Sequence, residues 1–134
     1  MSTFNLSILA PERKLLQNEA VESLILTTVE GEIEVLPGHA DMISTLDTGR
    51  FMFRQANGKK VVGVISTGFL NIEDGSVKVI AETIELAGEI DKNRAKQAQA
   101  NAEKRLTEAG LDEHAFKKYQ LKLQRSIIRQ SVDN

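Results

Sequence analysis

The residues with the clearest capacity for chemistry are arginines near the C-terminus. Arg125 and Arg129 lie four positions apart, which places both guanidinium groups on one face of a helix. If the chain folds back so that Arg94 joins them, the three groups converge, and a phosphate is the natural ligand of converging guanidinium groups. A solvated cationic face is the usual alternative, and the spacing alone leaves both interpretations open.

Two carboxylates, Glu32 and Glu34, stand two positions apart. Such a pair can act as an acid and a base when the surroundings separate the two pKa values. Here the alternation with Ile33 and Val35 indicates a strand with one face in water, where both carboxylates are solvated. We therefore interpret Glu32 and Glu34 as surface residues without an acid-base role.

His39 follows Pro37 and Gly38 in a predicted turn, because proline fixes φ and glycine tolerates a positive φ. The other histidine, His114, lies far along the chain in a predicted helix, and there is no cysteine. Zinc sites use roughly three or four ligands, so these residues predict no metal site. An interface or a structural hydrogen bond is the better interpretation of His39.

The segment Gly63-Val64-Ile65-Ser66-Thr67-Gly68 has the glycine spacing of a phosphate-binding loop. Phe69 and Leu70 follow it, in place of the lysine and hydroxyl residue that would contact phosphate and magnesium. We interpret the glycines as points of close packing between sheets. No group of residues suited to nucleophilic or acid-base catalysis stands out elsewhere, so the sequence argues against an enzyme.

The elements that position these residues change character near Gly88. Before it, short β-branched segments such as Ser76 to Ala81 alternate apolar and polar residues. About ten such segments, spaced closely, predict an N-terminal antiparallel β-sandwich. Asn57-Gly58 and Asp74-Gly75 are expected to form two-residue type I′ turns, since both central residues of that turn need a positive φ.

Beyond Gly88 the apolar residues recur with the period of a helix. Small residues dominate the first stripe and large ones the second: Ala95, Ala98, Ala102, Leu106 and Ala109, then Phe116, Tyr119, Leu123 and Ile127. Asp91 and Asp112 are expected to cap the two helices, with Gly110 after the first. These patterns predict a sandwich domain over residues 1–87 and an antiparallel two-helix hairpin over residues 88–134.

Charge is distributed unevenly between these two parts. The chain has 17 basic and 19 acidic residues, but the predicted sandwich has a net charge of −5 and the predicted hairpin of +3. The overall balance argues against a dedicated nucleic-acid binder. No segment reaches the roughly 18 apolar residues of a membrane span, and we expect a soluble, intracellular protein. The second helix has basic residues without an acidic one among them: Lys117, Lys118, Lys122, Arg125 and Arg129.

These residues resemble the epsilon subunit of bacterial F-type ATP synthases. The segment Gly31 to Ala40, GEIEVLPGHA, is similar to the family's GELGILPGHA signature, and Ser66 to Ile72 is similar to its SGGFLEV segment. Ile90-Asp91-Lys92-Asn93-Arg94-Ala95 matches in full the I/L-D-x-x-R-A motif with which some members bind ATP. The resemblance extends over the entire chain, with sandwich and hairpin in the same order.

The resemblance implies a non-catalytic rotor subunit, peripheral on the cytoplasmic face of the bacterial inner membrane and in contact with the membrane only through the complex. The sandwich is expected to attach to the gamma subunit and the c ring, with Glu32 facing the c ring and His39 near gamma. The hairpin is expected to switch between a compact form on the sandwich and an extended form among the catalytic alpha and beta subunits. In the extended form it blocks ATP hydrolysis, and an acidic segment of beta meets the basic second helix through Lys117, Lys118 and Lys122.

The same resemblance implies that ATP is a regulatory ligand of the compact form and that no cofactor is required. Phosphates are expected to contact Arg94, Arg125 and Arg129. The nucleoside is expected to contact Asp91 and Glu85. Ile90 and Ala95 complete the expected set through the motif. A free-standing nucleotide-sensing β module with a helical arm is the alternative, and copurification with gamma would distinguish the two.

Overall fold

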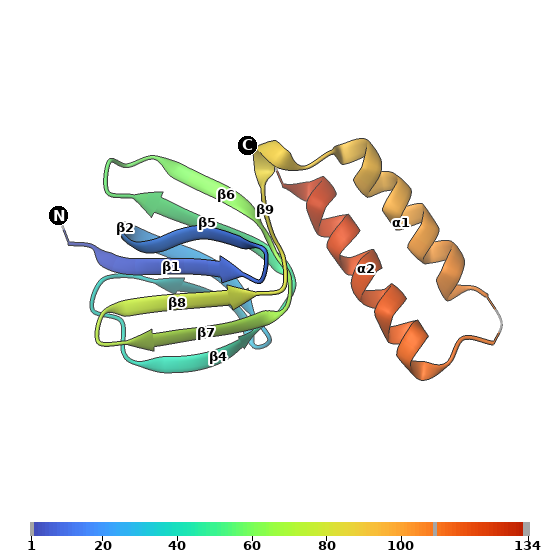
Figure 1. The fold of residues 1–134 in the computed structure, drawn as a ribbon, viewed down its shortest axis with the longest axis horizontal. Helices are drawn as coiled ribbons and strands as arrows, with labels where there is room; N and C mark the ends of the chain where they lie inside the picture. The colour runs from blue at the N-terminus through green and yellow to red at the C-terminus, as the bar shows by residue number, and fades with distance from the viewer. Residues whose placement is uncertain (1, 109, 133–134) are drawn as a thin grey trace.

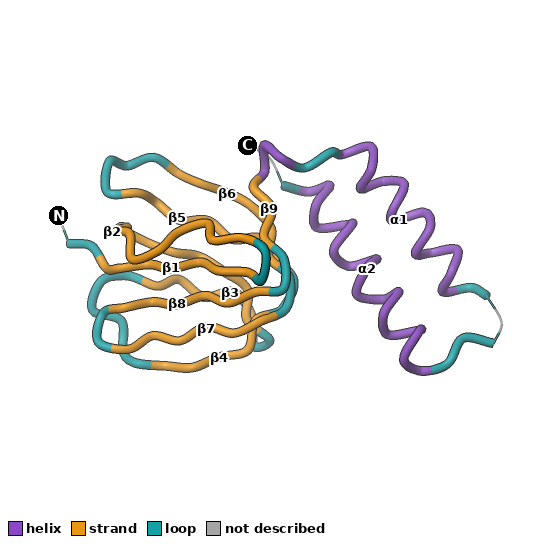
Figure 2. Tube along the Cα trace, in the orientation of Figure 1, coloured by secondary structure: helices purple, strands orange, loops and turns teal. Residues whose placement is uncertain are grey.

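The computed structural model describes residues 2–108 and 110–132. Figures 1 and 2 show a β-sandwich with two antiparallel helices set beside one end of its strands. The predicted fold class is confirmed, with nine strands in the described part of the chain. In chain order the elements are β1 (Phe4–Ala10), β2 (Arg13–Thr28), β3 (Gly31–Val35), β4 (Met42–Leu46), β5 (Gly49–Gln55), β6 (Lys60–Ile65), β7 (Gly68–Glu73), β8 (Ser76–Ala81), β9 (Ile84–Leu86), a 3₁₀ turn (Ala87–Glu89), α1 (Lys92–Leu106) and α2 (Glu113–Ser131).

The long strand β2 connects the two layers of the sandwich. It pairs with β1 from Arg13 to Val21, on both sides of Asn18, whose φ is 53°. It pairs with β5 from Val21 onward and with β3 from Leu24 onward. The strand order is β1-β8-β7-β4-β2-β5-β6-β9, with β3 also on β2. Among the described pairings, β1 with β8 is parallel and the others are antiparallel.

The core between the layers belongs to the sandwich alone. Its buried members all lie between Phe4 and Ile84, and they include the stacked rings of Phe51 and Phe53, with centroids 6.3 Å apart. Burying an apolar side chain of this size contributes about 1.5 to 3 kcal/mol. The sandwich therefore has a hydrophobic core that needs no side chain from the helices.

Gly63 in β6 and Gly68 at the start of β7 are points of close packing, but between neighbouring strands rather than between sheets. A Cβ on Gly63 would meet the carbonyl oxygen of Glu85 and would lie 2.7 Å from the ring of Phe51. A Cβ on Gly68 would overlap the carbonyl oxygen of Ile80 on the adjacent β8. Any side chain at these positions would push paired strands apart, which explains the glycines without a phosphate ligand.

The predicted turn type is right at one hairpin and wrong at the other. Asp74 and Gly75 have φ values of 49° and 75°, as a type I′ turn requires. In the other hairpin Gly58 has a positive φ, 87°, whereas Asn57 does not. The Gly58 N–H donates to the Gln55 carbonyl, so the loop has three residues and ends on Gly58. The Asn57 side chain accepts from the Lys59 N–H instead, at 2.9 Å.

Both helices are capped as the sequence predicted. The Asp91 carboxylate accepts from the N–H groups of Asn93 and Arg94 at 3.0 and 3.1 Å, and the Asp112 carboxylate accepts from Ala115 at 2.7 Å. Gly110, between the helices, has a φ of 85°. Ala109, expected at the end of the small-residue stripe, lies outside the described residues.

The contact between the helices is built from small residues on both sides. Ala95 and Ala102 of α1 are buried as predicted, and Ser126 is the buried residue of α2. The expected seam of large residues on α2 is only partly correct, because Phe116 and Ile127 are 42% and 47% exposed. Small side chains allow the helices to approach closely, and the large ones lie at the edge of the contact.

The hairpin contacts the sandwich through the C-terminal end of α2. Val132 is buried with Val64 of β6 and Ala87 of the 3₁₀ turn, and Ile90 and Ile128 pack against them. Nearer the middle of α2, the Gln124 amide donates to the Asp47 carboxylate at 3.4 Å. The end of α1 and the beginning of α2 lie away from the sandwich (Figure 1). Neither described helix is long and apolar enough to cross a membrane.

Candidate functional site

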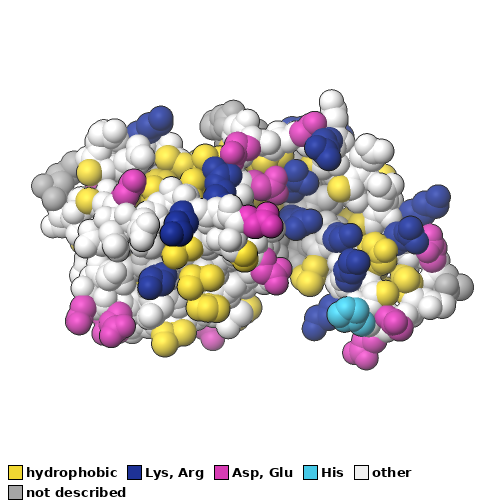
Figure 3. Space-filling view, in the orientation of Figure 1, with side chains coloured by type: hydrophobic (Ala, Val, Ile, Leu, Met, Phe, Trp, Pro, Cys, Tyr) yellow, Lys and Arg dark blue, Asp and Glu magenta, His cyan; other side chains and the backbone are white. Residues whose placement is uncertain are grey.

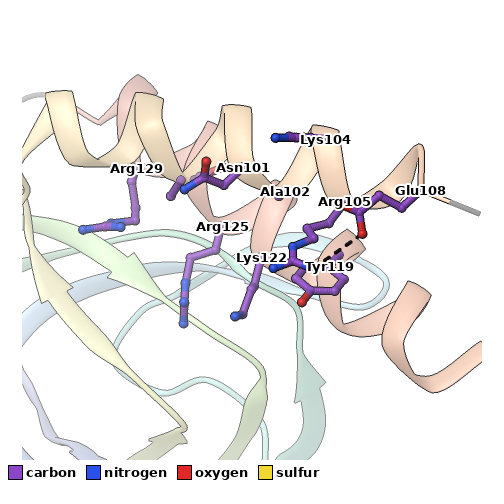
Figure 4. A pocket seen from close by; sticks show the side chains of 11 residues that line it. Asn101, Ala102, Lys104, Arg105, Glu108, Tyr119, Lys122, Arg125 and Arg129 are labelled. Carbon is purple, nitrogen blue, oxygen red and sulfur yellow. Dashed lines mark hydrogen bonds and ion pairs between the residues drawn. The ribbon is translucent and has the colours of Figure 1, made fainter. Parts of the chain in front are cut away.

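A groove of about 640 Å³ runs along the contact between α1 and α2. The short side chains of Ala98, Ala102 and Ser126 line it and leave space between the helices. Its charged side chains come from both helices (Figure 4), and five are basic against one acidic, Glu108: Lys104, Arg105, Lys122, Arg125 and Arg129. Figure 3 shows this gathering of basic side chains over the helices. The groove is therefore a candidate site for an anion.

Two of the predicted ligand residues form an ion pair at the inner end of the groove. A guanidinium nitrogen of Arg129 lies 3.0 Å from a carboxylate oxygen of Glu85 on β9, and the side chains are 19% and 27% exposed. The Arg129 Nε is buried and has no hydrogen-bond partner among the described residues. Arg129 thus joins α2 to the sandwich and still has an unused donor.

The motif residues lie at the start of α1. Asp91 is the cap of the helix, Ala95 is buried in it, and Ile90 packs in the small cluster beneath the hairpin. Lys92, inside the same motif, donates its ammonium protons to the carbonyl oxygens of Gln130 and Val132. These contacts give the motif a structural role, because they attach the beginning of α1 to the end of α2.

The three arginines expected to converge are placed differently. Arg125 and Arg129 line the groove, and Arg94 is exposed on α1 outside its lining. Lys104, Arg105, Tyr119 and Lys122 line the groove and were not predicted as ligands. One signal for Lys122 was available in the sequence, since it stands three positions before Arg125 and so shares its helix face. The ligand roles themselves stay predictions.

A second cleft, of about 320 Å³, separates α2 from loops at the end of the sandwich. Lys117, Lys118, Lys122 and Arg125 line it from the helix, opposite Glu82 of the sandwich. Lys122 and Arg125 therefore border both the cleft and the groove. Figure 4 shows these two side chains pointing from α2 toward the sandwich.

The other predicted interface residues lie on the sandwich. Glu32 is exposed on β3. His39 follows that strand in the turn with Gly38, whose φ is 85°. The His39 N–H donates to the Leu36 carbonyl at 3.1 Å, and its ring Nδ1 lies 2.7 Å from the Ala40 carbonyl. The histidine thus has the structural hydrogen bonds that the sequence suggested, and its role in an interface stays a prediction.

The connection between the two parts carries one perturbed carboxyl group. Arg13 Nη1 lies 2.7 Å from Glu89 Oε1, and the Leu86 N–H donates to the same oxygen at 2.9 Å. The hydrogen bond from Arg13, with that from Leu86, holds the pKa of Glu89 below the ordinary value of a glutamate. In the described part of the chain, no group of three or more His, Cys, Asp and Glu residues could hold a metal ion.

Comparison with known families matches nearly the whole chain. Residues 3–87 match the model of the ATP synthase delta/epsilon chain, beta-sandwich domain, and residues 89–132 match that of its long alpha-helix domain. The ATP synthase epsilon chain of an Exiguobacterium species is 33% identical over 132 residues, which cover 98% of this chain and 96% of that protein. The epsilon chain of Syntrophomonas wolfei is 36% identical over 128 residues, which cover 96% of this chain and 92% of that one.

Solved structures give the same result. A chain in the mitochondrial ATP synthase of Euglena gracilis, in a structure of OSCP, F1 and c-ring, has a TM-score of 0.86 at 25% identity, over 98% of this chain and 81% of that one. A chain in the central stalk and c-ring of the Tetrahymena thermophila enzyme shares the fold, with a TM-score of 0.63 at 12% identity over 95% and 93%. The resemblance seen in the sequence is confirmed, and the chain belongs to the delta/epsilon family of ATP synthase subunits as an epsilon subunit of the F-type enzyme.

Proposed function

We propose that this chain is a non-catalytic subunit of the rotor, which links gamma to the c ring and restrains ATP hydrolysis through its helix hairpin. One observation carries the proposal: nearly the whole chain superposes on a chain of a solved F1 and c-ring assembly, with a TM-score of 0.86. We place the subunit at the cytoplasmic face of the bacterial inner membrane, where it is peripheral and reaches the membrane only through the complex.

An exposed apolar surface on the sandwich supports attachment to a protein. Ile43 on β4 and Phe69 on β7 are 78% and 51% exposed, and their strands are paired. Adjacent exposed apolar side chains are typical of protein interfaces. We assign this surface to gamma, with His39 nearby in the chain and Glu32 toward the c ring.

The thin attachment of the hairpin supports a conformational switch. Three buried residues, Val64, Ala87 and Val132, form the cluster beneath it, together with the Arg129–Glu85 ion pair. An element with so few buried contacts opens at lower free energy than the sandwich. In the extended form the basic side chains of α2, with Lys117, Lys118 and Lys122 among them, are free to meet an acidic segment of the beta subunit.

ATP is the proposed ligand of the compact form. The groove draws basic side chains from both helices, and Arg129 also contacts Glu85 of the sandwich. A ligand that touches all three elements stabilises the compact form by its differential affinity for that form. At a concentration 100-fold above its dissociation constant, such a ligand contributes about 2.7 kcal/mol.

Copurification with gamma tests the rotor assignment. The tagged chain, expressed together with the gamma subunit of the same organism, is expected to elute with it as a one-to-one complex. Replacing Ile43 and Phe69 together with Ser should weaken the complex. Val29→Ser, which removes another exposed apolar side chain, should not. A chain that elutes alone at all concentrations would instead be a free-standing module.

A further inference from the structure

We propose that the outer half of the groove is a subsite for a chain of phosphates, held by Arg105 of α1 and Lys122 of α2 beside Tyr119. The proposal deepens the nucleotide site proposed above, because it states how far the anion site extends. It adds Arg105 and Lys122, which lie outside the Ile90–Ala95 motif, to the residues expected to contact the phosphates.

Three cations lie near one aromatic ring at this place. Lys122 Nζ lies 5.5 Å from the centre of the Tyr119 ring, and Arg105 Cζ and Lys118 Nζ each lie 5.9 Å from it. Figure 4 shows Arg105, Tyr119 and Lys122 close together, although they come from different helices. Each cation is attracted to the ring, but the three repel one another.

The carboxylates nearby neutralise only part of this charge. Glu108 lies 3.5 Å from Arg105, and both side chains are about half exposed, so water screens the pair. Glu85 neutralises Arg129 at the other end of the groove. Lys104, Lys122 and Arg125 have no carboxylate within ion-pair distance among residues 2–108 and 110–132. The groove therefore keeps an excess of positive charge that an anion can neutralise.

The shape of the basic row suits an elongated anion. Lys122, Arg125 and Arg129 follow one face of α2, and at 1.5 Å per residue they span about 10 Å along the helix. Guanidinium groups match the oxygens of phosphate through paired hydrogen bonds. The buried Nε of Arg129 is a further donor without a partner in the described chain. A volume of about 640 Å³ is also typical of a site for a small molecule.

A phosphate chain in this position joins α1 to α2 and favours the closed hairpin. It can be the phosphate tail of a nucleotide or an inorganic oligophosphate, because both present the same oxygens. The contact proposed for the beta subunit differs from it, since Lys117 does not line the groove. An acidic protein segment is therefore the competing occupant that the test must exclude.

The chain contains its own reporter for this subsite. Tyr119 is the single tyrosine, and there is no tryptophan, so the intrinsic fluorescence of the full-length protein reports on the groove. Titration with sodium tripolyphosphate is expected to change it in a saturable way, and orthophosphate should require at least about tenfold higher concentrations, since it reaches fewer donors.

Substitutions on both helices identify the ligands. Arg105→Gln and Lys122→Gln should each weaken tripolyphosphate binding about tenfold, as expected for a lost charged hydrogen bond. Arg105→Lys, which keeps the charge, should bind with intermediate affinity. Lys96→Gln, on an exposed part of α1 outside the groove, should bind like the wild type. Circular dichroism of each variant should show the same helical content as the wild type.

The outcomes separate this proposal from the nucleotide function. If tripolyphosphate gives no saturable signal, or if both glutamine variants bind it like the wild type, the subsite does not exist. If ATP binds but tripolyphosphate does not, the nucleotide function stands and the subsite does not exist. If tripolyphosphate binds but ATP does not, the subsite stands and the nucleotide function fails. Displacement of tripolyphosphate by a polyglutamate peptide at lower concentrations would assign the groove to an acidic protein and overturn the proposal.

Discussion

The Arg129 guanidinium and the Glu85 carboxylate lie 3.0 Å apart and join α2 to β9, the last strand of the sandwich. The ion pair stands beside the cluster of Val64, Ala87 and Val132, where the hairpin rests on the sandwich. The hairpin is thus attached mainly at the C-terminal end of α2. Release of the hairpin requires this contact to break together with the hydrogen bond from Gln124 to Asp47.

Breaking the ion pair should loosen the hairpin without unfolding the sandwich. Glu85→Gln leaves Arg129 as a largely buried cation without a counter-charge, and we expect a cost of about 1 to 2 kcal/mol for docking. Amide hydrogen exchange should become faster in α2 and stay unchanged in β5 and β7. Glu73→Gln, an exposed carboxylate on β7, is the control. Equal acceleration in all strands would mean that the ion pair stabilises the whole fold instead.

The sandwich should fold without the hairpin. Its core is formed by residues between Phe4 and Ile84, so a fragment of residues 1–87 retains all of these side chains. We expect this fragment to unfold cooperatively in urea and to bind gamma with unchanged affinity. An insoluble fragment, or one that no longer binds gamma, would show that the two parts form a single unit.

The contact between Arg13 and Glu89 should depend on pH. The hydrogen bond from Arg13 lowers the pKa of Glu89 in the folded protein. The contact therefore stabilises the fold above the unfolded glutamate pKa, about 4.3, and this stabilisation is lost as the pH falls through the lower folded value. Since both side chains are about a third or more exposed, we expect less than about 1 kcal/mol. Urea unfolding of Glu89→Gln should differ from the wild type at pH 7 and converge with it near about pH 3. The same difference at both values would contradict this assignment.

ATP should bind the isolated protein through its arginines. Arg129→Ala and Arg94→Ala are each expected to weaken binding about tenfold in calorimetry, as is usual when a charged hydrogen bond is lost. Lys96→Ala is a better control than Lys104→Ala, because Lys104 lines the groove. Arg94 is exposed beside the groove, so an unchanged affinity in Arg94→Ala alone would place the phosphates farther along the hairpin. If millimolar ATP releases no heat with the wild type, the motif is structural in this protein.

Local features were predictable from the sequence, and features that depend on distant partners were not. The caps at Asp91 and Asp112 follow from residue type and spacing. Asn57-Gly58 is compatible with a two-residue and with a three-residue hairpin loop. The pairing of β5 with β6, which the dipeptide alone does not specify, selects the three-residue loop. The helical period placed Phe116 and Ile127 on an apolar stripe, but both are exposed, whereas Ser126 is buried and Ile128 packs against the sandwich.

The candidate site shows the same division. Arg125 and Arg129 were identified from their spacing along one helix. Arg105 was not, because its position beside Tyr119 depends on how α1 and α2 align along each other. That alignment is set by buried small residues, Ala95, Ala102 and Ser126, whose packing a periodic pattern on one helix does not specify.

Steady-state ATP hydrolysis by the F1 complex rebuilt with this chain tests most directly whether it is a regulatory rotor subunit. The wild-type chain is expected to lower the rate. Replacing Lys117, Lys118 and Lys122 together with Ala should restore the rate of the complex without the chain, while gamma binding is retained, because the acidic partner of α2 loses its contacts. Replacing Lys14, Lys59 and Lys60 on the sandwich removes the same charge and should leave inhibition intact. A rate that is the same with and without the bound wild-type chain would contradict the proposed regulation.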